Sequence, residues 1–503
     1  MGGKGEKSTV LAVLCLVVVV ASLDNTVLNV ALPVLARSLD ASNSQLQWIV
    51  DAYSLVFAGL LLTSGTLSDR YGRRRALTAG VAIFGLASLW AMLSTSPAEL
   101  IAARCATGVG GAAMVPATLA ILTNLFTDEE RPQAIATWGA VSMIGFAAGP
   151  IVGGLLLRRF GWQSVFAVNL PLVAVTLVGI ALVVPESRAP VPRRLDLHGA
   201  VLSSVGVVAL VYAIIGVPVH GWTDARTLVG FAAAVALLAA FAWWERRTPH
   251  PLLPFELWRN PSFSGASFAI TLVFFALAGG LFLMTQYFQL VRGWTPLHAG
   301  VATLPTLAGA LVGAPVSPWL LGRLGCRRAT ALGLGWVAVG LGLGAGVAHG
   351  GGYPVFGVGV ALVGYGMATA MTPAADALMG SLDKDRAGVG SAVNDTTQEV
   401  GGALGVAILG SIVGAAYSGG LHLAGVPAAV HRSLAAALVT AARLPPARAA
   451  ELASAARASF LRALGAGFLV ATLLAVASAL VALVVLPGRP VRGPAPAPAP
   501  APD

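Results

Sequence analysis

A series of long apolar runs separated by short loops most constrains how this sequence can fold. Each run approaches the roughly 20 apolar residues that cross a bilayer, so the pattern predicts fourteen membrane-spanning helices. Only 10% of the 503 residues are charged, whereas a soluble domain has about 25%. We therefore expect an all-α membrane protein whose first apolar run is retained as a helix. The predicted spans are 10–32, 46–66, 76–95, 98–122, 134–156, 164–184, 197–217, 227–244, 262–288, 297–320, 329–348, 354–376, 388–416 and 463–486.

The distribution of arginine predicts the orientation in the membrane. The short loop 65–75 has four arginines within six positions. Such loops stay on the cytoplasmic side, and an even number of spans puts both termini on that side. We expect a multi-pass protein of the plasma membrane with both termini in the cytoplasm. The net charge of +10 reflects this sorting, so no nucleic-acid partner is expected.

A weak internal repeat predicts the domain organisation. Residues 317–328 align with residues 64–75, including a glycine near the end of each segment. Transporters are often built from repeated halves with the substrate site between them. The repeat predicts four segments: a first six-helix bundle at 1–186, a two-helix insertion at 187–260, a second six-helix bundle at 261–486 with a long outside loop at 417–462, and a Pro/Ala tail at 487–503.

Two motifs point to conformational gating. The stretch Gly65-Thr-Leu-Ser-Asp69-Arg70-Tyr-Gly72-Arg73-Arg74 resembles the signature loop of the major facilitator superfamily. The resemblance implies two six-helix bundles, here with two inserted linker helices, and a contact of Asp69 with the N-terminus of a helix in the opposite bundle. The stretch Gly145-Phe-Ala-Ala-Gly149-Pro150-Ile-Val-Gly153-Gly154 in the fifth span resembles the antiporter motif of that superfamily. The predicted gating residues are Gly65, Asp69, Arg70, Gly72, Arg73, Arg74, Gly145, Gly149, Pro150, Gly153 and Gly154.

Acidic residues within the spans are candidates for proton coupling, because charges inside a membrane usually mark ion or substrate routes. Asp24 lies in Leu-Asp-Asn-Thr-Val-Leu-Asn-Val-Ala-Leu-Pro, which resembles a motif of fourteen-helix drug:proton antiporters. Arg104 lies in Arg-Cys-Ala-Thr-Gly-Val-Gly-Gly, which resembles a family motif associated with proton transfer, with Thr107 in place of the motif's glutamine. Either residue could instead belong to a structural ion pair between helices. The predicted proton-coupling residues are Asp24, Arg104, Glu399, Asp51 and Asp395.

Aromatic and amide side chains within the spans are candidates for substrate contacts. Asn25 and Asn29 lie one helical turn apart beside Asp24. Aromatic residues in membrane helices also pack in the core or form belts, so this reading stays open. The predicted substrate-binding residues are Asn25, Asn29, Tyr53, Trp138, Gln286, Tyr287, Gln289, Tyr365 and Asn394.

The resemblance implies a transporter that exports amphipathic drugs or antibiotics in exchange for protons, acting as a monomer with no cofactor and no metal. One alternative is a dedicated exporter of a single metabolite, such as an antibiotic made by the same cell. A channel or a membrane enzyme is disfavoured. Six of the seven histidines fall in loops or at span ends, so no cluster for catalysis is expected. The sequence also has no phosphate-binding loop of the Gly-x-x-x-x-Gly-Lys type, which argues against ATP as the energy source.

Overall fold

The computed structural model describes residues 4–41, 43–188, 196–249, 251–254, 256–294, 296–346, 353–421, 427–431 and 434–486. These residues form helices and no strand. The predicted tail 487–503 lies outside them. The principal helices are α1 (Lys4–Ser38), α2 (Asn43–Tyr71), α3 (Arg73–Leu93), α4 (Pro97–Leu125), α5 (Arg131–Arg159), α6 (Ser164–Ala167), α7 (Asn169–Val183), α8 (Leu197–His220), α9 (Ala225–Glu245), α10 (Glu256–Arg259), α11 (Pro261–Gln286), α12 (Pro296–Val301), α13 (Leu304–Ala345), α14 (Tyr353–Gly380), α15 (Ala387–Gly420), α16 (Leu434–Ala441) and α17 (Pro446–Val485).

The helix count agrees approximately with the prediction of fourteen spans. Thirteen helices of the described residues are long and apolar enough to cross a membrane. One of them, α13, is interrupted at Gly325, whose φ of 75° and ψ of 168° are not helical. Glycine adopts a positive φ without steric cost. Gly325 therefore divides α13 into two helical segments, each long enough to account for one of the predicted spans.

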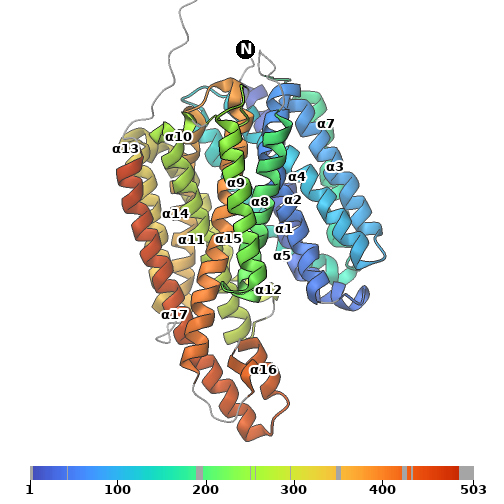
Figure 1. The fold of residues 1–503 in the computed structure, drawn as a ribbon, viewed down its shortest axis with the longest axis vertical. Helices are drawn as coiled ribbons and strands as arrows, with labels where there is room; N and C mark the ends of the chain where they lie inside the picture. The colour runs from blue at the N-terminus through green and yellow to red at the C-terminus, as the bar shows by residue number, and fades with distance from the viewer. Residues whose placement is uncertain are drawn as a thin grey trace, which may run out of the picture.

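The last part of the chain differs from the sequence-based expectation of a loop at 417–462 followed by a span at 463–486. Helix α17 begins at Pro446 and continues without interruption to Val485. Proline suits the first turn of a helix because its missing N–H would have no partner there. Figure 1 shows α16 and the first turns of α17 extending beyond the other helices at one end of the molecule. We call this end the α16 face.

The opposite end collects the arginine-rich loops and is here called the basic face. It contains the start of α1, the junction of α2 with α3, and the starts of α5 and α15 (Figure 1). At the α2–α3 junction, Gly72 has a φ of 112° and its amide donates to the carbonyl of Ser68 at 3.1 Å. A side chain would be strained in this backbone conformation.

The inserted helices α8 and α9 lie along one side of the junction between the two bundles (Figure 1). Helix α8 packs against α2 of the first bundle and α15 of the second. The hydroxyl groups of Thr63 on α2 and Ser204 on α8 are 3.3 Å apart. Near the α16 face, Trp222 Nε1 donates to Ser411 Oγ on α15 at 3.0 Å. The insertion therefore contacts both bundles.

Glycines on α5 allow α1 to approach closely. A Cβ atom at Gly145 would lie 3.0 Å from the Cα of Val19, and one at Gly153 would lie 2.9 Å from Val27 Cγ2. Gly149 lies against Thr26, whose hydroxyl donates to the carbonyl of Phe146 at 3.0 Å. Small residues at such spacing let two helix backbones come together in a membrane. This contact fixes the position of α1, which carries Asp24.

Candidate functional site

A cavity of about 580 Å³ lies between the two bundles. Its walls come from α1, α2, α4 and α5 on one side, and from α11, α14 and α15 on the other, with α8 closing one edge. Most of the lining is apolar, as is usual for pockets that bind organic ligands. The polar side chains in the wall are Ser22, Asn25, Asp51, Tyr53, Ser54, Trp138, Ser142, Asp395, Gln398 and Glu399.

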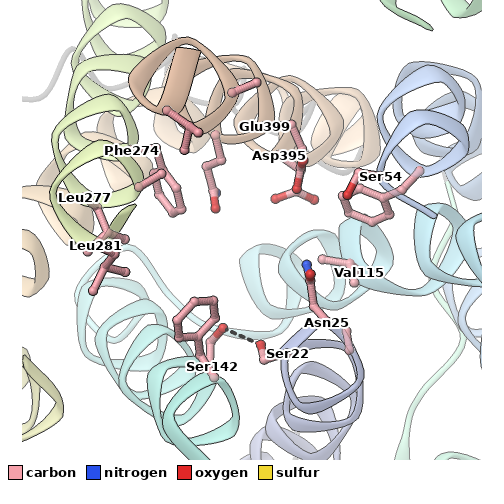
Figure 2. Close-up of a pocket in the computed structure, with 18 of the residues that line it drawn as sticks. Ser22, Asn25, Ser54, Val115, Ser142, Phe274, Leu277, Leu281, Asp395 and Glu399 are labelled. Carbon is pink, nitrogen blue, oxygen red and sulfur yellow. Dashed lines mark hydrogen bonds between the residues drawn. The ribbon is translucent and has the colours of Figure 1, made fainter. Parts of the chain in front are cut away.

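Two acids of α15 face Asn25 of α1 across this cavity, as Figure 2 shows. Asp395 is 4% exposed; its Oδ1 accepts a hydrogen bond of 2.9 Å from Asn394, and its Oδ2 has no partner among the described residues. Glu399 is half-buried one turn further along α15. Across the cavity the hydroxyls of Ser22 and Ser142 are 3.0 Å apart (Figure 2). The cavity thus combines an apolar wall with two carboxyl groups on one side.

Asp24 and Arg104 form a buried ion pair behind the cavity wall. Arg104 Nη1 donates to Asp24 Oδ2 at 2.6 Å, and the two residues are 1% and 0% exposed. Arg104 Nε also donates to the carbonyl of Ile49 at 3.2 Å. Because the pair is removed from water, each charge depends on the other, and removing one partner of such a pair typically costs about 3–5 kcal/mol.

The start of α4 places Arg104 for this contact. Ser96 accepts from the amide of Glu99 at 3.3 Å, and Glu99 in turn accepts from the amide of Thr95 at 2.8 Å. This reciprocal capping fixes where α4 begins. Arg104 lies about two turns after the start of α4, in the half of the helix nearer the α16 face.

Asn169 is a third member of this cluster that the sequence analysis did not assign. Its Nδ2 donates to Asp24 Oδ1 at 2.7 Å and to Ser88 Oγ at 3.3 Å, and the residue is 0% exposed. The carboxylate of Asp24 therefore accepts hydrogen bonds at both oxygens. Two signals were available for Asn169: it is an amide at the start of an otherwise apolar span, and it lies in the stretch 161–171, which resembles a segment of the superfamily.

Tyr53 connects this cluster to the cavity. The guanidinium carbon of Arg104 lies 4.7 Å from the centre of the Tyr53 ring, and Tyr53 lines the cavity. The ring stacks on Phe57, with centroids 5.6 Å apart. A Cβ at Gly111 would lie 3.0 Å from the Tyr53 hydroxyl oxygen, so a glycine at this point of α4 leaves room for the ring. One aromatic layer thus separates the ion pair from any cavity occupant.

The other predicted substrate-binding and proton-coupling residues differ in whether they line the cavity. Asn25, Tyr53, Trp138, Asp51, Asp395 and Glu399 line the cavity. Gln286, Tyr287, Gln289, Tyr365 and Asn394 are not part of its lining among the described residues. Tyr287 packs instead against Phe288 and Phe356, and Tyr365 against Trp336. The side chain of Asn29 lies outside the described part of the structure.

At the basic face, Asp69 of α2 binds the N-terminus of α15. Its Oδ1 and Oδ2 each accept from the amide of Gly388 at 3.0 Å, and Oδ2 accepts from the amide of Val389 at 3.2 Å. Arg73 donates to Oδ1 of the same carboxylate at 2.9 and 2.7 Å. A carboxylate at a helix N-terminus contributes about 0.3–1 kcal/mol, up to ~2 when partly buried. Gly65 lies directly against Gly388 and Ala392.

The other gating candidates lie around this contact or on α5. Arg74 Nη2 donates to the carbonyl of Ala181 at 2.8 Å, which connects the α2–α3 junction to α7. Arg70 is half-buried beside Tyr71, with its guanidinium carbon 5.1 Å from that ring centre. On α5, Pro150 lies against Gly300 of α12, whereas Gly154 is half-buried further along the helix.

An inter-bundle ion pair that the sequence analysis did not assign lies near this contact. Arg131 at the start of α5 donates from Nε to Asp376 Oδ1 on α14 at 2.6 Å. Polar contacts therefore join the two bundles at the basic face. Among the described residues, no group of three or more His, Cys, Asp or Glu side chains is placed to hold a metal ion.

Comparison with known proteins identifies relatives along most of the chain. The sequence profile of the Major Facilitator Superfamily matches residues 14–406. Multidrug resistance protein Stp of Mycobacterium tuberculosis is 39% identical over 421 residues, covering 83% of this chain and 78% of the relative. The tetracenomycin C resistance and export protein of Streptomyces glaucescens is 34% identical over 97% of this chain and 93% of its own. Multidrug efflux pump LfrA of Mycolicibacterium smegmatis is 35% identical over 94% of each chain.

Solved structures of transporters share the fold. The human organic anion transporter MFSD10 aligns with a TM-score of 0.60 at 17% identity, covering 93% of this chain and 99% of its own. The proton:xylose symporter XylE aligns with a TM-score of 0.61 at 14% identity, covering 97% and 98%. At this identity the likeness concerns the arrangement of helices alone.

Proposed function

The chain belongs to the major facilitator superfamily of membrane transporters, and from this premise we propose that it exports amphipathic organic compounds in exchange for protons. It is a transporter and not an enzyme. Transport would follow from alternating access, in which the two bundles rock about the central cavity. The observation that carries the proposal is the buried Asp24–Arg104 pair beside a mostly apolar cavity between the bundles.

The lining of the cavity supports an amphipathic substrate. Phe57, Trp138 and Phe274 offer apolar surface, whereas Asp395 and Glu399 offer acceptors for a polar or cationic group. A ligand that buries an apolar body and satisfies a few polar groups matches such a pocket. Relatives named for multidrug resistance and multidrug efflux support the same substrate class.

Three acids support the coupling to protons. Asp24 is held by Arg104 and Asn169, so a proton arriving at its carboxylate would release both contacts. Asp395 and Glu399 lie in the cavity, where a cationic substrate and a proton would compete for the same oxygens. A carboxyl group that is either protonated or paired avoids an uncompensated charge in a dry cavity. We propose Asp24 as the main coupling site and Glu399 as the second.

The contacts at the basic face support the assignment of this structure to the state of the transport cycle that is closed at that face. Asp69 with Gly388, and Arg131 with Asp376, join the two bundles at that end of the cavity. We propose that the basic face is cytoplasmic, that both termini lie there, and that the protein acts as a monomer in the plasma membrane. In this orientation the structure would be closed to the cytoplasm.

A dedicated exporter of one endogenous metabolite is the second candidate. The relative from Streptomyces glaucescens, which covers nearly all of this chain, is named for resistance to and export of tetracenomycin C. The two functions differ in breadth: a multidrug pump moves many unrelated compounds, whereas a dedicated exporter moves a single scaffold.

The test uses purified protein in liposomes that contain a pH-sensitive dye. Addition of a panel of amphipathic compounds should produce proton movement in the direction opposite to the substrate, for several unrelated scaffolds. A response to one scaffold alone would favour the dedicated exporter. Saturable compound movement with no pH change under any imposed gradient would overturn proton coupling.

A further inference from the structure

A second cavity lies outside the bundle interface, between α2 and the inserted helices α8 and α9. Its volume is about 460 Å³. It is lined by the first turns of α2, the last turns of α8 and the start of α9, so it lies near the α16 face. Asp51 and Ile215 line both this pocket and the central cavity. The two spaces are therefore neighbours that share one acidic side chain.

An aromatic surface borders this pocket. The rings of Trp48 on α2 and Tyr212 on α8 are stacked, with centroids 6.1 Å apart and planes 25° apart. They are 41% and 43% exposed. Aromatic pairs at such separations are favourable, and the outer faces of the rings remain open to a planar ligand.

Hydrogen-bonding groups form the other side. Arg226 at the start of α9 is exposed, and its guanidinium forms no ion pair with any described residue. Thr227 is 2% exposed, and its Oγ1 has no hydrogen-bond partner among the described residues. His220 Nδ1 lies 3.2 Å from the carbonyl of Gly216. The ionisable groups that face the pocket are Asp51, His220, Arg226 and Tyr212.

We propose that this pocket is a second substrate subsite that binds the oxygen-rich end of an amphipathic aromatic compound. Arg226 and Thr227 would donate to keto, hydroxyl or carboxylate oxygens, while the Trp48–Tyr212 stack holds the ring system. The rest of the ligand would reach the central cavity past Asp51. This inference rests on the proposed export of amphipathic compounds and adds a chemical preference to it.

A plain aromatic cation fits the pocket less well. Arg226 would repel it, and it would bring no oxygen acceptor for Arg226 or for the buried hydroxyl of Thr227. The subsite therefore selects among aromatic compounds by their oxygen atoms rather than by positive charge alone. This subsite would therefore add affinity for oxygen-rich ligands, whereas the acids of the central cavity favour cationic groups.

The experiment compares two fluorescent probes, doxorubicin, which is rich in keto and hydroxyl groups, and ethidium, which has none. Affinity is measured on the purified full-length protein and transport in liposomes, for Arg226→Gln and Gly216→Phe. A Cβ at Gly216 would meet only His220 Nδ1, at 3.5 Å, so the larger side chain can project into the pocket. The matched control is Val205→Phe, on an exposed part of α8 outside both cavities.

We expect Arg226→Gln to weaken doxorubicin binding about tenfold and ethidium binding less than about twofold. Gly216→Phe should have the same selectivity, and Val205→Phe should bind both probes like the wild type. An equal loss of affinity for doxorubicin and ethidium would overturn the proposed subsite. Unchanged affinity for both probes would also overturn it, and this is the result expected if Trp48 and Tyr212 only anchor the protein at the bilayer surface. Failure of the proposed function is a separate observation, because wild-type protein would then bind the probes without moving protons.

Discussion

Arg131 of α5 and Asp376 of α14 join the two bundles through a hydrogen-bonded ion pair of 2.6 Å at the basic face. The two residues are 7% and 6% exposed. Arg131 also donates to Asp128 at 3.0 Å, but that contact stays within one segment of the chain. Opening the basic face would have to break the pair with Asp376 and leave the pair with Asp128 intact.

The first prediction follows from this difference. Asp376→Asn should favour the conformation open at the basic face, because an amide replaces a charge-assisted contact that is worth about 1.5–3 kcal/mol. Spin labels on the basic-face ends of α5 and α14 should report a larger population of long distances. Asp128→Asn is the matched control and should leave the distance distribution close to that of the wild type. Equal shifts in the two variants would contradict a role for the inter-bundle pair.

The second prediction concerns Asp69 and Gly388. Asp69→Asn should also populate the open basic face and slow transport without abolishing substrate binding, since it removes a favourable charge of about 0.3–2 kcal/mol at the start of α15. Gly388→Ala should act in the same direction, because its Cβ would meet Asp69 Cγ at 2.8 Å and the backbone of Gly65.

Gly322→Ala is the control for Gly388→Ala. Gly322 occupies the position in the second repeat that Asp69 occupies in the first, and a Cβ there meets nothing within 4 Å. Cysteine accessibility from the basic face should rise in the Asp69 and Gly388 variants and not in the Gly322 variant. Unchanged cysteine accessibility in all three variants would show that the contact between Asp69 and Gly388 does not hold the basic face closed.

The helix count could be predicted from the sequence because a bilayer imposes a length and a composition on every span. The family and the two-bundle fold were expected from the resemblance of the motifs around Asp69 and Asp24. The contact of Asp69 with the N-terminus of α15 was expected from the family resemblance of the loop 65–75. In that family the corresponding aspartate contacts the N-terminus of a helix in the opposite bundle. Arg131 with Asp376 could not be predicted, because each lies in a stretch without a recognisable motif and the residues are far apart in the chain. Asn169 was assigned no role for a related reason: one amide in an apolar run does not reveal which helix it faces.

The substrate candidates illustrate the same limit. Tyr287 and Tyr365 resemble Tyr53 in the sequence, since all are aromatic residues within spans. Only Tyr53 lies at the cavity, because the rotation of each helix decides which face meets the opposite bundle. Helices that are apolar on every side carry little periodicity from which that rotation can be read.

The third prediction tests orientation. In a variant without the native cysteines, Ser454→Cys on the exposed start of α17 should react with an impermeant thiol reagent added outside intact cells. Arg188→Cys, exposed at the basic face, should react only after the membrane is opened. The reason is that short basic loops stay in the cytoplasm. Labelling of Arg188→Cys in intact cells, with protection of Ser454→Cys, would reverse the proposed orientation.

The fourth prediction concerns Asp24. Asp24→Asn keeps the volume of the side chain and a hydrogen-bonding oxygen but removes the exchangeable proton. We expect it to abolish substrate-driven proton movement and uphill export, while downhill exchange of substrate continues. Liposomes with an imposed pH gradient separate these two activities. Glu399→Gln, at the cavity wall, is the comparison variant and should reduce coupling less.

Stability must be separated from coupling in this test, because Asp24→Asn leaves Arg104 buried without its counter-charge at a cost of about 3–5 kcal/mol. Asp24→Asn combined with Arg104→Gln removes both charges, and it should recover the thermal stability that the single variant loses. Its transport should still lack proton coupling, since no titrating group remains in the cluster. A stable double variant that exports uphill would show that Asp24 and Arg104 are only structural, and Glu399 would then become the leading candidate for the coupling site.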